Sequence, residues 1–396
     1  MLEVVGTTRR STSTTTTNNN KSVPLKFAQD DARIAAFGRA LDELKAEIES
    51  ELGQQDAEHI LSVGKLSRRM EIAGRTLIQL SFDPFTFSLG VGALFVHKAL
   101  ELMEIGHPAL HGCYDGLPGC EKYASATFDW ESPVDEESWK KVHNVKHHQF
   151  TNIEGKDPDM NFAMLRLSAR VPYRFAFLMQ PISNVLTTFG FGMALQLHVT
   201  GMLDIYMQNG DLQVLPDRKP ATIAKQNKIF LRKMVKHYAR EYVFFPLLGG
   251  PVAPKVLLGN VLSEVLRDMW AAAIIYCGHV GARDYPAGTE PATRAHWYAM
   301  QVEGGRDCDV PEWVSILCGA LDKQIEHHLF PRLPPNRLRQ IAPRVRALCA
   351  EYGVEHRYQS WPGTLASVLG ELLRLASPKA EAEPAPYAAT NAVAAE

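Results

Sequence analysis

The 396-residue sequence lacks the features of several common classes of protein. Its six cysteines are scattered with no Cys-x-x-Cys pair, which argues against a disulfide framework or a zinc-finger module and fits a reducing compartment. The formal net charge is only −2, so nothing in the charge indicates a nucleic-acid partner. Residues 1–27 contain no apolar core and no small-residue cleavage site, so we expect no secretory signal.

Both ends of the chain lack apolar periodicity. Residues 1–29 are polar and of low complexity, and residues 377–396 are rich in Ala, Glu and Pro. Such segments bury too little apolar surface to offset the entropy of folding. We therefore expect both to be disordered, flanking an amphipathic helical region at 30–66 and a main domain at 67–376.

Long hydrophobic runs are scarce, and the mean hydropathy is −0.15. A membrane-spanning helix needs about 20 apolar residues, so residues 85–100, which follow a break at Asp83–Pro84, qualify only marginally. Residues 66–82 contain three arginines and predict no more than a short interfacial helix. Further apolar runs lie at 175–206, 242–262 and 269–281, and Arg267 and Asp268 separate the last two.

The polar segments predict the position of the helices relative to a membrane. Residues 211–240 are strongly basic, which predicts a cytoplasmic location by the positive-inside rule.

From Asp30 and Asp31, which can cap a helix, apolar residues recur at steps of three and four, as in an amphipathic helix: Ile34, Phe37, Leu41, Leu44 and Ile48. Acidic residues dominate its polar face, so we expect it to pack on the body of the protein.

Seven of the 14 histidines fall into three short boxes next to apolar segments. His107 and His111 stand four apart, as do His143 and His147, which His148 follows directly. The third box is QIEHH, with the members Gln324, His327 and His328. Residues three or four apart share one face of an α-helix, so each box would present its imidazoles together.

Neutral imidazole is a good ligand for iron, copper or zinc. One histidine pair alone is weak evidence, because a surface or core histidine is the more common explanation. Three boxes together predict a multi-histidine metal centre. His279 ends an apolar run, where a polar residue is costly unless it is partnered or functional. Pro334 and Pro335 open a helix that we expect to cover the metal face.

Polar residues beside the boxes are candidates for orienting the ligands. Metal-bound histidines usually donate their second ring nitrogen to a carboxylate or a carbonyl. Loop capping explains each candidate equally well, and the candidates are Asp115, Asn144, Asn152, Asp157, Asp159, Asp322 and Glu326.

The boxes HxxxH, HxxxHH and QxxHH, in this order, resemble those of the membrane-bound fatty acid desaturases. The sequence QIEHHLFP is similar to the branch with front-end and bacterial acyl desaturases, and the resemblance extends from about Lys98 through GKDPDMN to the RVRALCAEYGV segment. It implies an all-α, polytopic membrane bundle with a cytoplasmic helical cap that contains the boxes and the active site. It also implies His279 as a further iron ligand, whereas Gln324 could bind iron weakly or only orient a neighbour.

The resemblance further implies two non-haem iron ions, molecular oxygen and a fatty acyl substrate attached to CoA, a carrier protein or a lipid. No His-Pro-Gly-Gly haem motif is present, so electrons must come from a separate ferredoxin, with its reductase, or from a cytochrome b5. The chain departs from the family pattern at Pro108 and over residues 116–126. A proline there kinks a helix and alters the first box.

Other functions remain open at this point. Hydroxylation, acetylenic bond formation or decarboxylation to a terminal alkene would use the same site and depend on sub-ångström placement of the substrate. A non-catalytic membrane protein that only binds metal is an alternative from another class. A soluble ferritin-like site would need repeated Glu-x-x-His motifs, and only Glu104 with His107 fits one. The number of membrane crossings is unresolved, since convergence of the boxes requires an even number between the second and third.

Overall fold

The computed structural model describes residues 32–162, 165–207 and 212–382. Regular structure in these ranges is almost entirely helical, which confirms the predicted all-α class. The two strands among the described residues, β1 (Asp307–Asp309) and β2 (Tyr358–Ser360), pair in parallel. The segment 1–29 and residues 383–396, predicted to be disordered, lie outside the described residues, as do the capping candidates Asp30 and Asp31.

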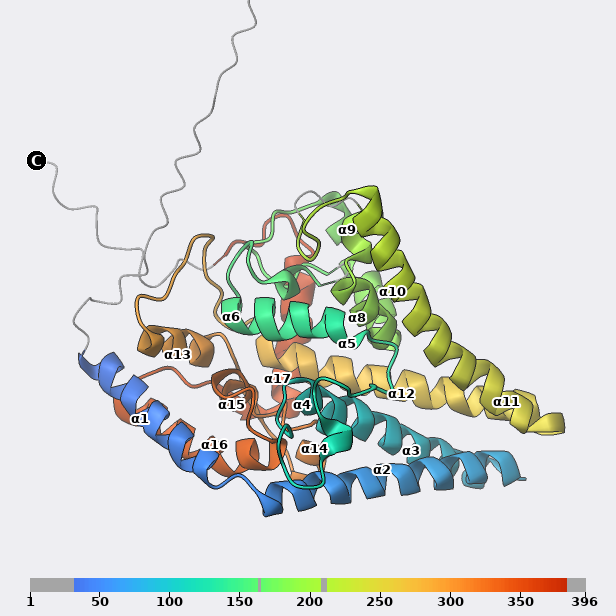
Figure 1. Ribbon diagram of the computed structural model, residues 1–396. Helices are drawn as coiled ribbons and strands as arrows, with labels where there is room; N and C mark the ends of the chain where they lie inside the picture. The colour runs from blue at the N-terminus through green and yellow to red at the C-terminus, as the bar shows by residue number, and fades with distance from the viewer. Residues whose placement is uncertain (1–31, 163–164, 208–211, 383–396) are drawn as a thin grey trace, which may run out of the picture.

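Figure 1 shows how the helices are arranged. The α-helices are α1 (Ala32–Ser50), α2 (Gln54–Leu80), α3 (Pro84–Leu100), α4 (His107–Leu110), α5 (Glu136–Trp139), α6 (His148–Phe150), α7 (Gln180–Phe189), α8 (Phe191–Val199), α9 (Met202–Tyr206), α10 (Pro220–Ala239), α11 (Phe245–Leu248), α12 (Ala253–His279), α13 (Arg294–Glu303), α14 (Glu312–Leu317), α15 (Gln324–Leu329), α16 (Pro335–Tyr352) and α17 (Trp361–Leu375). The π-helices are η1 (Glu101–Gly106), η3 (Lys140–His147) and η6 (Arg240–Phe244), and the short 3-10 helices are η2 (Glu121–Tyr123), η4 (Pro158–Asn161), η5 (Phe175–Met179) and η7 (Gly250–Val252).

Two long helical hairpins lie side by side and end at the same side of the molecule, on the right in Figure 1. The first hairpin joins α2 to α3, and Asp83 caps α3 by accepting a hydrogen bond from the Thr86 backbone N–H at 2.9 Å. Pro84 occupies the first turn of α3, where its missing N–H costs nothing. The break predicted at Asp83–Pro84 is therefore confirmed. The second hairpin joins α10 and α11 to α12 through η7.

Two sequence predictions about these hairpins are wrong. The short helix predicted at 66–82 is instead the C-terminal half of α2, a single helix of 27 residues that ends at Leu80. The runs 242–262 and 269–281 are not two elements separated by charge, because α12 continues from Ala253 to His279. Arg267 and Asp268 lie inside it, and both are buried.

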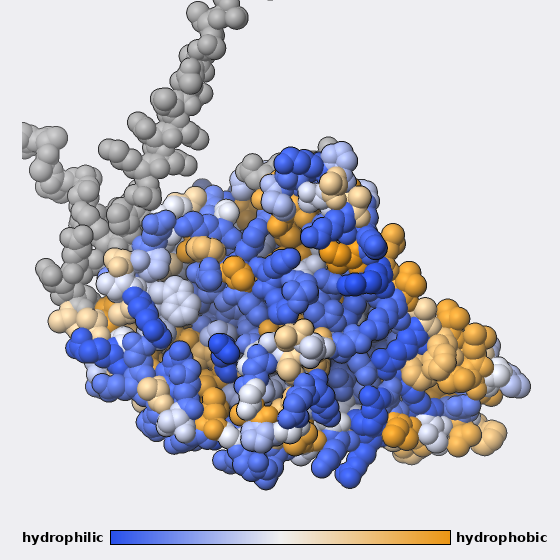
Figure 2. Space-filling model, viewed as in Figure 1, coloured by the Kyte–Doolittle hydropathy of each residue, from blue (hydrophilic) through white to orange (hydrophobic). Residues whose placement is uncertain are grey.

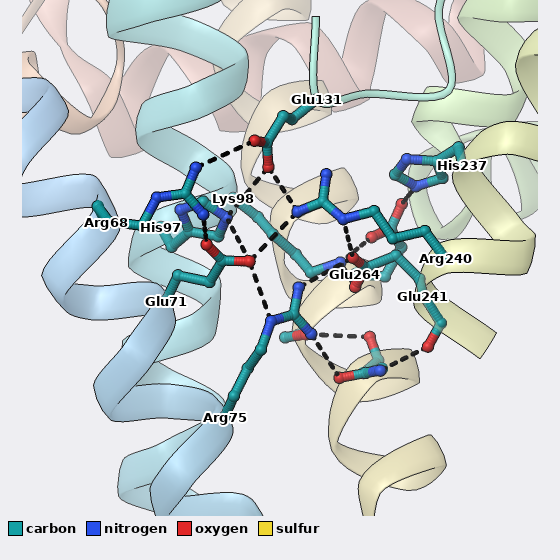
Figure 3. Close-up of polar contacts among 12 residues, drawn as sticks. Arg68, Glu71, Arg75, His97, Lys98, Glu131, His237, Arg240, Glu241 and Glu264 are labelled. Carbon is teal, nitrogen blue, oxygen red and sulfur yellow. Dashed lines mark hydrogen bonds and ion pairs between the residues drawn. The ribbon is translucent and has the colours of Figure 1, made fainter. Parts of the chain in front are cut away.

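The charged residues of the hairpins pair with one another, which explains both corrections (Figure 3). Lys98 on α3 contacts Glu264 of α12 and lies 2.9 Å from Glu241 of η6. Arg75 of α2 lies 3.0 Å from Glu71 and 2.9 Å from Glu241. A buried charge is costly unless it is paired and hydrogen-bonded, so these helices contain charges without being interrupted.

The ends of the hairpins expose apolar side chains. Phe82, Phe85, Leu247 and Leu248 are exposed there, and Figure 2 shows hydrophobic surface over the same end of the molecule. Within the described residues, one helix, spanning Pro84–Leu110, is long and apolar enough to cross a membrane by length and composition.

The opposite end contains the N-terminal helix and the helix opened by Pro335. The apolar faces of α1 and α16 share one core cluster with α13 and α15, which confirms that α1 packs on the body of the protein. Arg337 of α16 anchors this end, since its Nε lies 2.6 Å from Oδ1 of the buried Asp56 at the start of α2.

Candidate metal centre

The three histidine boxes meet at one point of the fold. The first box follows α3 through η1 into α4, the second lies on η3 and α6, and the third lies on α15. His279 at the end of α12 reaches the same place. Four segments far apart in the sequence therefore contribute side chains to one buried cluster.

The second box differs from its prediction, because residues 140–147 form a π-helix instead of an α-helix. A π-helix has i→i+5 hydrogen bonds, so residues five apart come to lie one above the other. The Nε2 atoms of His143 and His148 accordingly lie 3.2 Å apart. A π-helix, η1, also precedes the first box and continues directly into α4. Pro108 lies in the first turn of α4, so the proline does not end the helix.

The imidazole nitrogens form two neighbouring groups. His107, His111, His143 and His327 place ligand atoms within 4.8 Å of one another, and His147, His279 and His328 form the second group. His148 lies between them, since it also groups with His327 and His328. This arrangement offers two adjacent metal positions.

The distances between ring nitrogens fit a pair of metal ions. Nε2 of His107 lies 3.1 Å from that of His111 and 3.2 Å from that of His143, and the His147–His279 distance is 3.3 Å. Two ligands that are each ~2.1 Å from one metal at tetrahedral or right angles are roughly 3.0–3.4 Å apart. The Nε2 atoms of His327 and His328 are buried and have no hydrogen-bond partner among the described residues.

Several hydrogen bonds orient the rings from behind. His147 Nδ1 lies 3.1 Å from both carboxylate oxygens of Asp157, and His279 Nδ1 lies 3.2 Å from the backbone oxygen of Gly304. His328 Nδ1 lies 3.0 Å from Oε1 of Gln301. A neutral ring that donates through Nδ1 has its lone pair at Nε2, directed into the cluster.

The electrostatics favour neutral rings in most of the cluster. Burial, followed by the neighbouring imidazoles, lowers the pKa of His143, His148, His327 and His328 well below the ordinary 6.5. His147 is the exception. Burial alone would lower its pKa, but the charges of Asp157 and Asp159 outweigh burial and raise the pKa to about 9. Neutral imidazoles have the free lone pairs that a metal requires.

Gln324 lies beside His279, with its Nε2 atom 2.8 Å from the His279 Nε2 atom. The two orientations of its amide differ only in which end faces the cluster. One orientation donates to the His279 ring, and the other presents an oxygen as a weak ligand. The position of Gln324 fits both roles expected from the sequence.

The polar residues singled out beside the boxes divide into two sets. Besides Asp157, Asp159 lies 3.5 Å from His147 Nδ1 and 2.8 Å from His198 Nε2. Asn144 donates to the Leu110 backbone oxygen at 2.9 Å, which ties the second box to the first. Asn152 donates to the backbone oxygen of Gly304 at 2.8 Å.

Among the described residues, the side chains of the other three candidates contact no box histidine. Asp115 accepts from Ser125, and Asp322 accepts from the Ser315 hydroxyl. Glu326 faces His356 at 3.8 Å. Asp115 and Asp322 therefore hold loops beside the boxes, whereas Glu326 lies on α15 itself.

Sequence reasoning missed three residues that touch the rings. Gln301 and Thr151 both lie near His328 Nδ1, Thr151 at 3.1 Å, and neither belongs to a recognisable motif. Trp139 stacks on His143 with ring centroids 4.3 Å apart. It stands four residues before His143 in the second box, so helical spacing could have identified it.

Two pockets meet at the cluster. The first is mostly apolar and is lined by box histidines together with Leu102, Phe191, Leu195, Ile275, Tyr276 and Leu321. The second shares His147, His279 and Asp159 with the first and is lined by the charged residues Arg283, Asp284, Glu371 and Arg374. The pair suits a ligand with a long apolar chain and a polar head.

Comparison with known families shows to which family the chain belongs. The family model described as fatty acid desaturase matches residues 84–360. The chain belongs to the fatty acid desaturase family. The match begins with α3 and ends with β2, so this desaturase places all three boxes and His279 inside the family region.

Relatives of this desaturase come from several kingdoms. NADPH-dependent stearoyl-CoA 9-desaturase of Mycobacterium tuberculosis is 30% identical over 338 residues, which are 82% of this chain and 76% of that protein. The sn-1 linoleoyl-lipid 6-desaturase of Synechocystis is 26% identical and covers 72% of this chain and 80% of its own. The acyl-lipid (8-3)-desaturase of Mortierella alpina is 26% identical over 63% of this chain and 56% of its own.

Proposed function

We propose that this desaturase removes two hydrogens from neighbouring methylene groups of a fatty acyl chain, using O2 at a pair of non-haem iron ions. The observation that supports this is the convergence of eight imidazoles beside an apolar pocket that His107, His143, His147 and His279 line. The proposed iron ligands are His107, His111, His143, His147, His148, His279, His327 and His328, with Gln324 in either of its two roles.

The chemistry of the bound iron is activation of O2 for attack on an unactivated C–H bond, which no side chain can perform. The protein contributes position. The apolar walls formed by Phe191, Leu195 and Ile275 would hold the acyl chain straight against the histidines. Asp157 and Gly304 hold the rings of His147 and His279 from behind. Water is excluded because the box histidines are mostly buried.

The polar pocket is the proposed site of the acyl carrier. Arg283 and Arg374 line it together with acidic residues, so a charged head group bound there would place the acyl chain across the iron ions. The names of the relatives point to a CoA thioester in Mycobacterium and to lipid-bound chains in Synechocystis. The same carriers, with an acyl carrier protein as a third, are the candidates for this chain.

The ends of the two hairpins, around the turn from α2 to α3 and around α11, are the proposed membrane part. Their exposed apolar side chains would enter the bilayer, and an even number of crossings would leave all boxes on one side. The basic N-terminal part of α10 supports a cytoplasmic location for that side. This arrangement makes α1, α13, α15 and α16 a cytoplasmic cap.

Expression in a host that lacks its own desaturases, followed by mass spectrometry of the fatty acids, tests the proposal. We expect monounsaturated products, and none from a variant with His327→Ala and His328→Ala. Hydroxylated, acetylenic or chain-shortened products would instead assign one of the related oxidations. Bound iron with no oxygen consumption in the presence of acyl substrate and reductant would indicate a metal-binding protein without turnover.

A further inference from the structure

An exposed basic stripe follows one side of α10. Lys225, Lys228, Arg232 and Lys236 are exposed and recur at steps of three and four, so they share one helix face. Lys236 contacts Asp129, and Arg232 lies 3.4 Å from Asp135. Lys225 and Lys228 form no ion pair with the described residues, so the stripe retains positive charge that an external partner can neutralise.

The stripe leads to a pair of buried tryptophans. Asp129, the partner of Lys236, directly precedes Trp130. The buried Lys233, on the same helix, donates to the Trp130 backbone oxygen at 2.9 Å. The Trp130 indole is fixed in turn, since its Nε1 donates to the Glu101 backbone oxygen at 3.0 Å. The surface of α10 and the Trp130 ring are therefore joined within a few bonds.

The tryptophans continue to the histidines. The ring centroids of Trp130 and Trp139 are 5.5 Å apart, and Trp139 stacks on His143 at 4.3 Å. Trp139 also contacts His107 and His111, with ring centroids 5.3 Å away in each case. A contiguous series of aromatic rings thus connects the basic stripe to one half of the cluster.

We propose that the stripe on α10 is the docking surface for a soluble one-electron carrier with an acidic face, and that electrons tunnel from it through Trp130 and Trp139 to His143. This inference rests on the proposed function, because that reaction needs two electrons and two protons beyond the two hydrogens of the substrate to convert O2 into two waters. The carrier loses one electron per encounter and the histidine-bound site gains it. The two indoles mediate the coupling and are themselves neither oxidised nor reduced.

Charge complementarity favours this occupant, and the aromatic series distinguishes it from an anionic membrane surface. Complementary charges raise association rates and make them depend on salt. A lipid headgroup would account for the lysines, but it would leave the connection from Lys236 to the rings without a role. Binding to lipid is accordingly the rival outcome of the experiment.

The docking test uses the full chain in nanodiscs and a [2Fe–2S] ferredoxin as the probe. The double variant Lys225→Glu, Lys228→Glu is compared with Arg39→Glu, Lys45→Glu on α1, which has the same change in net charge on a helix far from α10 (Figure 1). We expect the first pair to slow association of oxidised ferredoxin with the metal-free protein by about tenfold at low salt, with the difference vanishing at high salt. The α1 pair should bind like the wild type.

Equal ferredoxin binding by both pairs would overturn the docking proposal. So would a loss of binding to anionic vesicles by the α10 pair with no change toward ferredoxin. Because binding is measured without metal, these outcomes are independent of whether the iron-loaded protein desaturates anything.

The route is tested by anaerobic stopped-flow oxidation of reduced ferredoxin at saturating concentration, without acyl substrate. We expect the limiting rate per bound iron to fall in the order wild type, Trp139→Phe, Trp139→Leu, with ferredoxin affinity unchanged. Trp361→Leu is the matched control, because Trp361 also contacts another tryptophan, Trp270, and donates to a backbone oxygen. Equal limiting rates at equal iron content would exclude the tryptophan route, and no oxidation by the iron-loaded wild type would instead contradict the proposed function.

Discussion

Replacing Asp157 with asparagine should loosen iron binding. Oδ2 of Asp157 accepts the Asn152 backbone N–H at 2.8 Å, and Oδ1 accepts that of Asp159 at 2.9 Å. Both oxygens also lie 3.1 Å from His147 Nδ1. An amide has one oxygen, so its NH2 group must face one of these N–H donors.

The magnitude follows from what His147 loses. A charged acceptor behind a ligating imidazole raises its basicity, and removing such a partner typically lowers metal affinity by about 10–100-fold. That range corresponds to ~1.4–2.7 kcal/mol. A lost hydrogen bond to a charged group is worth ~1.5–3 kcal/mol, which agrees with it.

The assay is anaerobic titration of the metal-free protein with ferrous iron. Asp115→Asn is the matched control, because Asp115 accepts hydrogen bonds from Ser125 at 2.7 and 2.6 Å and contacts no box histidine. We expect weakened binding of one of two irons in Asp157→Asn and wild-type binding in Asp115→Asn. Equal affinities in the two variants would refute the role of Asp157.

Three further predictions concern packing, the pocket and pH. Gly106→Ala should lower the melting temperature, measured by circular dichroism, and the iron content, measured by metal analysis. The reason is that a Cβ there would lie 1.9 Å from Nε1 of Trp130. Leu195→Trp should shift the products toward shorter acyl chains, measured by mass spectrometry of the fatty acids. Leu195 lines the apolar pocket, so a larger side chain there would shorten it. Asp56→Asn should lower the melting temperature by several degrees at neutral pH. Burial opposes ionisation of Asp56, but hydrogen bonds led by the one from Arg337 lower its pKa. The stabilisation is therefore complete above the unfolded pKa of about 3.9 and disappears as the pH falls through the folded value, so the two proteins should converge in melting scans below it.

The common face of the imidazoles in each box could be predicted from the sequence, because the spacing within a box is short-range information, whereas the meeting of the boxes at one site was expected from the family resemblance. The π-helical form of the second box could not. His143 is followed by histidines at both i+4 and i+5, a pattern that fits an α-helix and a π-helix equally well. In the π-helical register His143 and His148 meet at 3.2 Å, and the His143 ring contacts His111 and His327 of the other two boxes, which the sequence of one box does not encode.

The residues that hydrogen-bond to the histidine rings were likewise only partly predictable from the sequence. Asp157 lies ten residues from His147 and next to a box, so composition near the motif pointed to it. Gln301 and the Gly304 carbonyl come from α13 and the turn after it, and they meet the rings only through tertiary folding. Nothing local distinguishes Gln301 from other glutamines of the chain.

The prediction that charge interrupts α12 was wrong because hydropathy is scored one residue at a time, whereas the cost of burying a charge depends on its partner. Glu264, Arg267 and Asp268 look like an interruption in the sequence, yet Glu264 meets Lys98 of α3 and His237 of α10. Apolar helix faces in lipid fix axial register weakly, since any neighbour is equally apolar. A buried ion pair permits one register, because a shift of a single residue moves its partner by about 1.5 Å along the axis. The pair between Lys98 and Glu264 therefore sets α3 against α12, and these two helices lead to His107 and His279 respectively. Charge inside the hairpins thus positions the histidines that lie at their ends.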